Sequence, residues 1–555
     1  MKPRYSTALY LFIIGLLSSV AQAQLLTANK PTYGHADSLR GSLTPLRTCY
    51  DIQYYHLAIT VNIDEQTIRG SNLFRFEATT DFDRLQFDLF ANMQIEKISY
   101  HGEELPYTRE YHAVFVTFPN RIYAGNIDSM EVFYSGKPQI AVRAPWDGGF
   151  VFSKDSQGKP WVATACQGLG ASAWWPNKDH QSDEVDSMLI SVRVPNGLID
   201  VSNGRLRKKT AHSDGYTQFD WFVNNPINNY NVSLNIGDFV NFTDLYQGEK
   251  GTLNLSYWVL KENVAKAKQF FPKNVIPMLQ AFEYWFGPYP FYEDSYKLID
   301  APYLGMEHQS AITYGNKYAN GYLGNDGSGT GWGLKWDFII VHESGHEWFG
   351  NNITAKDLAD MWIHESFTNY SESLFLDYHY GKAAGLAYLH GNRQGILNDK
   401  PLQGLYGVNT EGSGDMYLKG GVFLNMIRTI LDNDALWRQI LRGLNKTFYH
   451  QTVTYDDIVQ EICQRSGKNL APVFAQYVQH ANIPTLEFRF KDNKTYARWI
   501  ADVPDFNMPV KVRIKGGDYQ FMDINRNWKE LPLKGANKEN IQVDTYNYYI
   551  GVLME

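Results

Sequence analysis

Cysteine is scarce in this chain of 555 residues, which contains only three. Cys49, Cys166 and Cys463 are far apart in the sequence, and none of them belongs to a C-x-x-C pair. A fold that depends on a framework of several disulfide bonds is therefore excluded. Three thiols allow at most one disulfide bond, so we expect at least one thiol to stay unpaired.

An excess of positive charge is also lacking. The chain has 51 lysines and arginines against 59 aspartates and glutamates, which gives a formal net charge of −8 and a pI near 6.0. Proteins that bind nucleic acid through its phosphates usually carry a basic surface. The sequence therefore predicts no nucleic-acid partner.

Long apolar runs are missing too, since no stretch approaches the roughly 20 apolar residues of a membrane-spanning helix. A shorter apolar run at 8–17 follows Lys2 and Arg4 and precedes Ala21-Gln22-Ala23. This pattern is typical of a secretory signal peptide, and a buried N-terminal helix is the alternative. We expect residues 1–23 to be a signal peptide. The mature chain is then exported, periplasmic or extracellular, and has no transmembrane anchor.

The composition is that of a folded protein, with 44% apolar and 20% charged residues. At roughly 100–200 residues per domain, the length suggests about three or four domains. Residues 45–240 predict an N-terminal antiparallel β domain, because apolar residues alternate there, as in Leu57, Ile59 and Val61. Glycine, asparagine, aspartate and proline separate its short apolar runs.

Helical spacing then predominates in residues 241–482. Pro272 and Pro277 interrupt the pattern at 264–286, which predicts two helices or one kinked helix. Further helices are predicted at 334–349, ending before Gly350, and at 361–380 and 419–431. The glycine-rich segment 321–333 lacks the G-K-[ST] of a phosphate-binding loop and indicates a flexible connector.

Residues 483–555 alternate again and predict a C-terminal β-sandwich-like segment. The predicted fold class is thus multidomain α+β. Its order is an N-terminal β domain, a mainly helical middle domain and a short C-terminal β module.

One short motif in the middle domain is typical of a metal-binding site. His342-Glu343-Ser344-Gly345-His346 matches H-E-x-x-H. Residues i and i+4 share one face of a helix, so both imidazoles can bind a single metal ion. Two surface histidines on a helix are the alternative interpretation.

A third ligand is predicted at Glu365, eighteen residues after His346. Two histidines and one glutamate leave the fourth tetrahedral position open, which is typical of a catalytic zinc rather than a structural one. Zinc lowers the pKa of a bound water to about 7, and Glu343 can accept its proton. Glu372, seven residues after Glu365, is placed to orient one of the histidines, or else it is a solvated helix acid. His364 faces about 100° away from Glu365 on a helix, so we interpret it as a neighbour and not a ligand.

Longer stretches around these residues resemble the gluzincin (thermolysin-like) zinc aminopeptidases. That family has H-E-x-x-H, eighteen residues, and then a glutamate in W-L-N-E-G-F; this chain has H-E-S-G-H-E-W-F-G-N and then W-I-H-E-S-F. L-G-M-E-H at 304–308 is similar to the G-x-M-E-N motif, and Y-L-K-G at 417–420 to Y-x-K-G. The likeness covers about residues 45–480. Departures at Leu304, His308, His364 and Ser366 affect substrate preference and loop geometry, not the predicted ligands or base.

The resemblance implies a saddle-shaped N-terminal β domain and a thermolysin-like catalytic domain with one zinc per chain. It further implies an aminopeptidase that acts on peptides with a free N-terminus. Glu343 is then the general base and Tyr417 the residue that stabilises the oxyanion. Four residues are implied to bind the substrate, with the first two contacting its amine: Glu307, Gln167, Gly305 and Met306.

Three alternatives stay open. A thermolysin-like endopeptidase shares the zinc chemistry, although a glutamate at an amine subsite is costly against an uncharged peptide interior. Epoxide hydrolysis is a side activity of some relatives, and no residue of this sequence points to it specifically. A catalytically inactive peptide-binding module is the non-enzyme alternative, and the intact ligands, base and tyrosine weigh against it.

Overall fold

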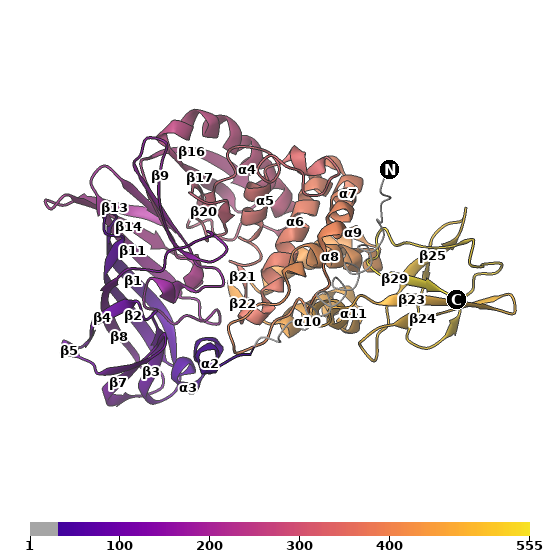
Figure 1. Ribbon diagram of the computed structural model, residues 1–555, viewed down its shortest axis with the longest axis horizontal. Coiled ribbons are helices and arrows are strands. Elements are labelled where there is room, and N and C mark those ends of the chain that lie inside the picture. Colours follow the sequence, from indigo (N-terminus) through magenta and orange to yellow (C-terminus); the bar gives the residue numbers. More distant parts are fainter. Residues whose placement is uncertain (1–31) are drawn as a thin grey trace, which may run out of the picture.

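The computed structural model describes residues 32–555. The predicted signal peptide at 1–23 lies outside the described residues. Figure 1 shows three parts along the long axis: a β-rich part, a helical middle and a small β module at the far end. The predicted α+β order is therefore confirmed. Within the described residues, none of the helices is long and apolar enough to cross a membrane.

The N-terminal part is built on an eight-stranded sheet. Strand β1, Tyr50–Asn62, lies in its middle, antiparallel to β2 and parallel to β11. Leu57, Ile59 and Val61 are at most 2% exposed, as their alternation predicts. The order in the sheet is β13(Arg205–Ala211), β14(Tyr216–Val223), β11(Ser187–Pro195), β1, β2(Thr67–Ala78), β8(Ile127–Gly136), β4(Met93–Tyr100), β5(Glu103–Glu104).

Two smaller sheets and two short helices complete this part. The sheets are β3(Phe82–Asp88), β7(Ala113–Ile122), β6(Tyr107–Glu110), and β12(Ile199–Ser202), β15(Leu234–Gly237), β10(Pro160–Ala165), β9(Gly149–Lys154). Helices α2(His35–Gly41) and α3(Pro45–Thr48) precede the first strand. The thiols of Cys49, Cys166 and Cys463 are all free.

A five-stranded sheet joins the N-terminal part to the helices. Its order is β16(Phe239–Gly248), β17(Gly251–Leu260), β18(Tyr296–Asp300), β20(Ile312–Tyr314), β19(Gly305–Met306). The predicted domain limit at residue 240 falls inside β16, which pairs along its length with β17. The short edge strand β19 brings residues 305–307 up to the helices that follow.

The first long helix is uninterrupted. Helix α4 runs over Val264–Phe286 as a single helix with Pro272 and Pro277 inside it, so the predicted alternative of two separate helices is wrong. A proline inside a helix costs about 3 kcal/mol. Packing offsets this cost, because the apolar stripe is fully buried: Ala267, Phe271, Val275, Met278, Leu279, Phe282.

The second predicted helix is shorter in the structure than the range that the sequence predicted. Helix α5 covers only Phe338–Gly345 instead of 334–349. Trp336 has an extended backbone (φ −149°, ψ 161°), and the Asp337 side chain then caps the helix by accepting the Ile340 amide. Beyond the helix, Gly350 adopts φ 137° in a turn, so the chain folds back into β21, Ile353–Ala355.

The helices predicted at 361–380 and 419–431 are α6(Trp362–Tyr380) and α8(Leu418–Leu431), which agree with the predicted ranges within one residue. Four further helices were not predicted individually: α7(Lys382–Asn392), α9(Asp434–Thr447), α10(Tyr455–Ser466) and α11(Ala471–Val478). Strand β22(Gln451–Val453) pairs in parallel with β21.

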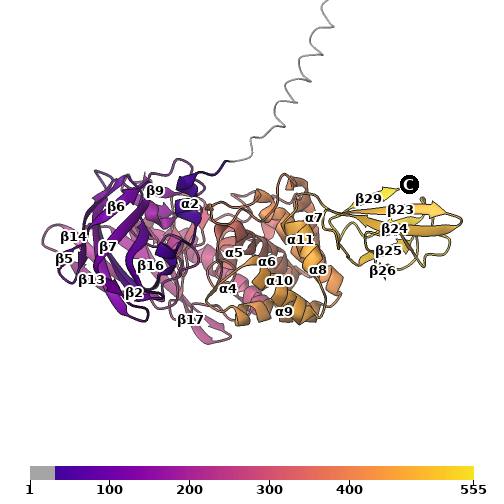
Figure 2. The same cartoon turned by 90° about the horizontal axis from the view of Figure 1, so that it is seen from below.

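The C-terminal module consists of two small sheets, β27(Lys529–Glu530), β24(Lys494–Ile500), β23(Thr485–Lys491), β29(Gly551–Met554), and β26(Gln520–Met522), β25(Val510–Ile514), β28(Ile541–Val543). Figure 2 places this module at the opposite end of the molecule from the N-terminal sheets. The buried apolar residues form two cores. One spans Cys49–Ala311, and the other spans Tyr246–Ile550 and so includes both the helices and the C-terminal sheets.

Candidate active site

Helix α5 carries two predicted metal ligands and the predicted base. His342 and Glu343 lie in its second turn, and His346 directly follows its last residue. His346 keeps helical backbone angles (φ −63°, ψ −21°), so the i, i+4 relation of the two histidines is preserved. Their ring centroids are 5.1 Å apart. Both imidazoles therefore face the same point.

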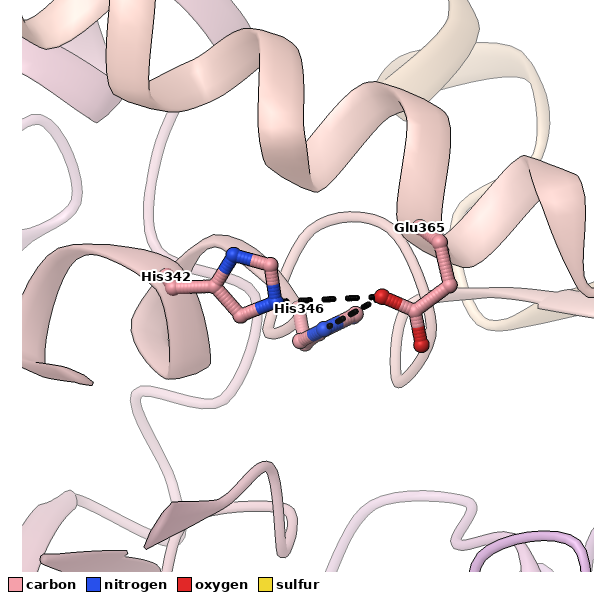
Figure 3. Close-up of side chains that lie close together, drawn as sticks. All are labelled: His342, His346 and Glu365. Carbon is pink, nitrogen blue, oxygen red and sulfur yellow. Dashed lines mark ion pairs between the residues drawn. The ribbon is translucent and has the colours of Figure 1, made fainter. Parts of the chain in front are cut away.

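Glu365, in the first turn of α6, completes the group (Figure 3). Its Oε2 atom lies 3.7 Å from His342 Nε2 and 3.5 Å from His346 Nε2. Donors bound at about 2.0–2.2 Å to one tetrahedral zinc would lie roughly 3.4 Å apart. Oε2 is buried and accepts no hydrogen bond from the described residues. The two nitrogens and this oxygen therefore fit one zinc ion.

Hydrogen bonds fix the orientation of both rings. His342 Nδ1 lies 2.8 Å from Glu372 Oε1, and the Tyr388 hydroxyl donates to Glu372 Oε2 at 2.6 Å. His346 Nδ1 lies 3.1 Å from the Phe349 carbonyl oxygen. In each ring, a hydrogen bond donated by Nδ1 leaves the Nε2 lone pair facing Glu365, which is the tautomer that a metal ligand needs.

Two further carboxylates adjoin the ligands. Glu307 and Glu343 are 2% and 8% exposed, and their oxygens lie within 4.8 Å of one another and of a His346 ring nitrogen. Tyr230 donates its hydroxyl to Glu307 Oε1 at 3.2 Å. Burial, followed by the Glu307 charge, raises the pKa of Glu343 to about 7. The site thus concentrates negative charge that a cation can offset.

Strand β19 is close to the base. A Cβ atom on Gly305 would lie 2.6 Å from Ile339 Cγ2 and 3.1 Å from Glu343 Oε1. Only glycine therefore lets this strand pass so near α5. Met306 follows, is 3% exposed, and lines the same cavity as Gly305.

Tyr417 immediately precedes α8 and faces the histidines. Its ring centroid is 6.0 Å from that of His342, with the planes 22° apart. Burial, with the nearby Glu365 and Glu307 carboxylates, raises the pKa of Tyr417 well above 10. The phenol therefore stays protonated and can donate a hydrogen bond.

Gln167 comes from the N-terminal part and contacts a ligand directly. Its Nε2 donates to Glu365 Oε1 at 3.0 Å. The family resemblance implied that Gln167 contacts the substrate amine, for which its carbonyl oxygen is the acceptor. The structure shows the other end of the amide bonded to Glu365, and the carbonyl oxygen makes no hydrogen bond within residues 32–555.

The sequence motifs did not predict several contacts in and around the site. Tyr230 and Tyr388 come from elements far from the motif in sequence, and nothing local distinguishes them from the chain's other tyrosines. His364 accepts the Ala355 amide hydrogen bond at 2.7 Å, so its ring faces away from Glu365. His308 is fully buried, and burial lowers its pKa to about 3.

A cavity of about 820 Å³ opens over these residues. The glycine-rich segment 321–333 forms part of its wall, where a flexible connector was predicted. Asp326 holds that segment together by accepting the Ser328 amide and hydroxyl at 3.0 and 2.7 Å. Residues of the N-terminal part, Pro145, Trp146, Gln167 and Gly168, form another part of the wall.

Comparison with known proteins identifies the helical part. Residues 273–477, which hold the three ligands, match the model of the peptidase family M1 domain. The chain contains a peptidase family M1 domain. The resemblance drawn from the short motifs is thereby confirmed.

Curated relatives of this chain are distant and longer. Mouse endoplasmic reticulum aminopeptidase 1 is 23% identical over 335 residues, 58% of this chain and 35% of that one. Probable aminopeptidase 1 of Sulfurisphaera tokodaii is 22% identical over 452 residues, 77% of this chain and 53% of that one. The chain thus spans about a third to a half of these relatives.

Solved structures match the fold of this chain more completely. A mutant M1 zinc metallopeptidase from Deinococcus radiodurans, bound to a Tyr-Ser-Ala substrate, superposes with a TM-score of 0.66 at 20% identity. The match covers 80% of this chain and 98% of that one. At this identity the likeness establishes the fold.

Proposed function

We propose that this protein is a zinc-dependent aminopeptidase that removes N-terminal residues from peptides. The observation that carries the proposal is the buried Glu307 carboxylate, within 4.8 Å of Glu343 and of a His346 nitrogen. A buried acid beside a metal site is favourable when a cation joins it. The free amine of a peptide, with a pKa near 8, is such a cation.

The metal would be held by His342, His346 and Glu365. When bound there, zinc would act as a Lewis acid and supply a water of lowered pKa. Glu343 accepts the proton of the attacking water and delivers it to the leaving amine. Tyr417 donates its hydroxyl hydrogen to the oxyanion that develops on the peptide carbonyl. Glu307 binds the substrate amine, which sets the bond that is cut.

Gln167 acts in two ways in this proposal. Its amide nitrogen fixes the Glu365 carboxylate, and its carbonyl oxygen offers the substrate amine a neutral acceptor. Gly305 and Met306 line the cavity beside Glu343 and bind the substrate backbone. We also propose that the chain is exported, on the strength of the pattern at residues 1–23.

An endopeptidase is the strongest competing function, because it uses the same ligands and base. Glu307 argues against it: an uncharged peptide interior would leave this buried carboxylate without a cation. An inactive binding module would have no need of the protonated Tyr417 and of Glu343 at the ligands.

Capping the substrate distinguishes these functions. We expect an N-acetyl group on a short peptide to lower kcat/KM by about 10–150-fold, because charge-assisted hydrogen bonds to Glu307 contribute roughly 1.5–3 kcal/mol. Glu307→Ala should lower the rate on the free-amine peptide by a similar factor, and Gln167→Ala by less. Product analysis by mass spectrometry measures both rate and position. Equal rates with and without the cap, or cuts at interior bonds, would favour the endopeptidase.

Glu372 provides a second, smaller prediction. Because it accepts the hydrogen bond of His342 Nδ1, Glu372→Ala should weaken zinc binding by about 10–100-fold. Competition with a chromogenic chelator measures that affinity directly. Tyr388→Phe, which removes one hydrogen bond to Glu372, should have a smaller effect. Unchanged affinity in Glu372→Ala would show that its contact with His342 is only structural.

A further inference from the structure

Three segments meet at the end of the cavity that Gln167 occupies. Loop 145–148 packs on the turn that carries Gln167, since a Cβ on Gly148 would lie 2.6 Å from Leu169 Cβ. Segment 407–411 borders the same turn, because Asn409 and Gly168 line one small hollow of about 30 Å³. Trp146 and Glu411 lie on these two segments, and both line the large cavity.

Trp146 is held at the cavity mouth with 68% of its surface exposed. The loop that presents it is braced by Asp147, whose carboxylate accepts the amide hydrogens of Val142 and Arg143 at 2.7 and 2.8 Å. A large flat ring fixed in an exposed position beside an active site is a surface for a ligand.

Glu411 is a carboxylate without a partner. Across residues 32–555, no hydrogen bond and no ion pair within 4.0 Å engages its side chain. Burial, and then the Glu365 charge, raises the pKa of Glu411, and Lys400 offsets part of this effect. Glu411 lines the same cavity as Tyr417 and Glu343. Its negative charge is available to a ligand in the cavity.

We propose that this end of the cavity binds the side chain of the substrate's first residue and selects arginine or lysine. The inference rests on the proposed aminopeptidase function. With the amine held between Glu307 and Gln167, the side chain of the first residue branches from the adjacent carbon atom and extends along the segments beside the Gln167 turn, where Trp146 and Glu411 line the cavity. The aliphatic part of the arginine or lysine side chain packs on the Trp146 ring. Its terminal cationic group lies at the edge of the ring and pairs with the Glu411 carboxylate. An aliphatic side chain at the first residue contacts only the Trp146 ring and leaves the Glu411 carboxylate unpaired.

The test is a set of aminoacyl 4-nitroanilides that differ only in the first residue: arginyl, lysyl, leucyl and glutamyl. We expect the wild-type enzyme to cleave arginyl over leucyl substrate by more than tenfold in kcat/KM, and glutamyl least. Glu411→Gln should reduce the arginyl-to-leucyl ratio at least tenfold, mainly through the KM of the arginyl substrate. Glu539→Gln, an exposed acid on the C-terminal module that changes the net charge equally, should leave the ratio unchanged.

Trp146 is tested separately. Trp146→Ala should lower arginyl kcat/KM several-fold, and Trp146→Phe should restore most of it, because a ring still faces the cation. The proposal is overturned if the wild type prefers leucyl substrate or if Glu411→Gln leaves the ratio intact. Cleavage without a basic preference rejects only this selectivity. No cleavage of any aminoacyl substrate rejects the aminopeptidase function itself.

Discussion

Glu343→Gln should retain a full equivalent of zinc and lose turnover by about 10²–10⁴-fold. The substitution keeps the shape of the side chain and removes its ability to accept a proton. The three ligands stay in place, because none of them hydrogen-bonds to Glu343 among the interactions of the described chain. Elemental analysis of the dialysed protein gives the metal content, and steady-state kinetics on a free-amine peptide gives kcat.

The ligands provide the matched control for this result. His342→Ala, His346→Ala or Glu365→Ala each leaves two donors, and each should lose most of the bound zinc together with activity. All of these variants should lose activity, so the metal content is the measurement that distinguishes the base from the ligands. A Glu343→Gln protein that turns over at nearly the normal rate would refute the assignment of the base. Loss of its zinc would show that Glu343 also holds the metal.

Tyr417→Phe is expected to lower kcat by about 10²–10³-fold with little change in zinc content. The hydroxyl hydrogen bond forms with an oxyanion that exists only in the transition state, so KM should change little. The ring that stacks near His342 is retained in phenylalanine, which confines the change to the hydroxyl group.

A buried tyrosine of similar contacts serves as the comparison. Tyr230→Phe removes a hydroxyl that donates to Glu307, so its effect should be on KM for free-amine peptides rather than on kcat. A rise in KM at normal kcat in Tyr417→Phe would instead make Tyr417 a substrate-binding residue.

The metal ligands were predictable because their geometry is local or nearly so. His342 and His346 are related by one turn of helix, and Glu365 follows on the next helix. The contact of Tyr230 with Glu307 and the bond from Gln167 to Glu365 were not, since they join segments separated by 77 and 198 residues. Tyr388 lies only 16 residues from Glu372, but it belongs to none of the motifs. Periodicity indicates which face of an element is buried and says nothing of which distant element covers it.

The ends and continuity of helices were the weakest part of the sequence interpretation. The pattern at 334–349 continued through Trp336 and Asp337, where a side-chain cap begins the helix later. Pro272 and Pro277 left two helices or one kinked helix as alternatives, and a fully buried stripe keeps α4 a single helix. In both cases the deciding interaction is a cap or a tertiary contact, which local spacing does not encode.

The apolar core shared by the helices and the C-terminal sheets has a consequence for how the chain can be shortened. Leu486, Phe488 and Trp499 belong to the same buried cluster as Phe474 and Tyr477 of α11, and the Tyr477 hydroxyl donates to the Tyr549 carbonyl oxygen at 2.7 Å. A truncation after residue 482 would therefore expose apolar residues of α11 rather than remove an independent domain. We therefore expect the helices and the terminal sheets to unfold as one cooperative unit, so that the stability of the zinc site depends on a module that lies far from it.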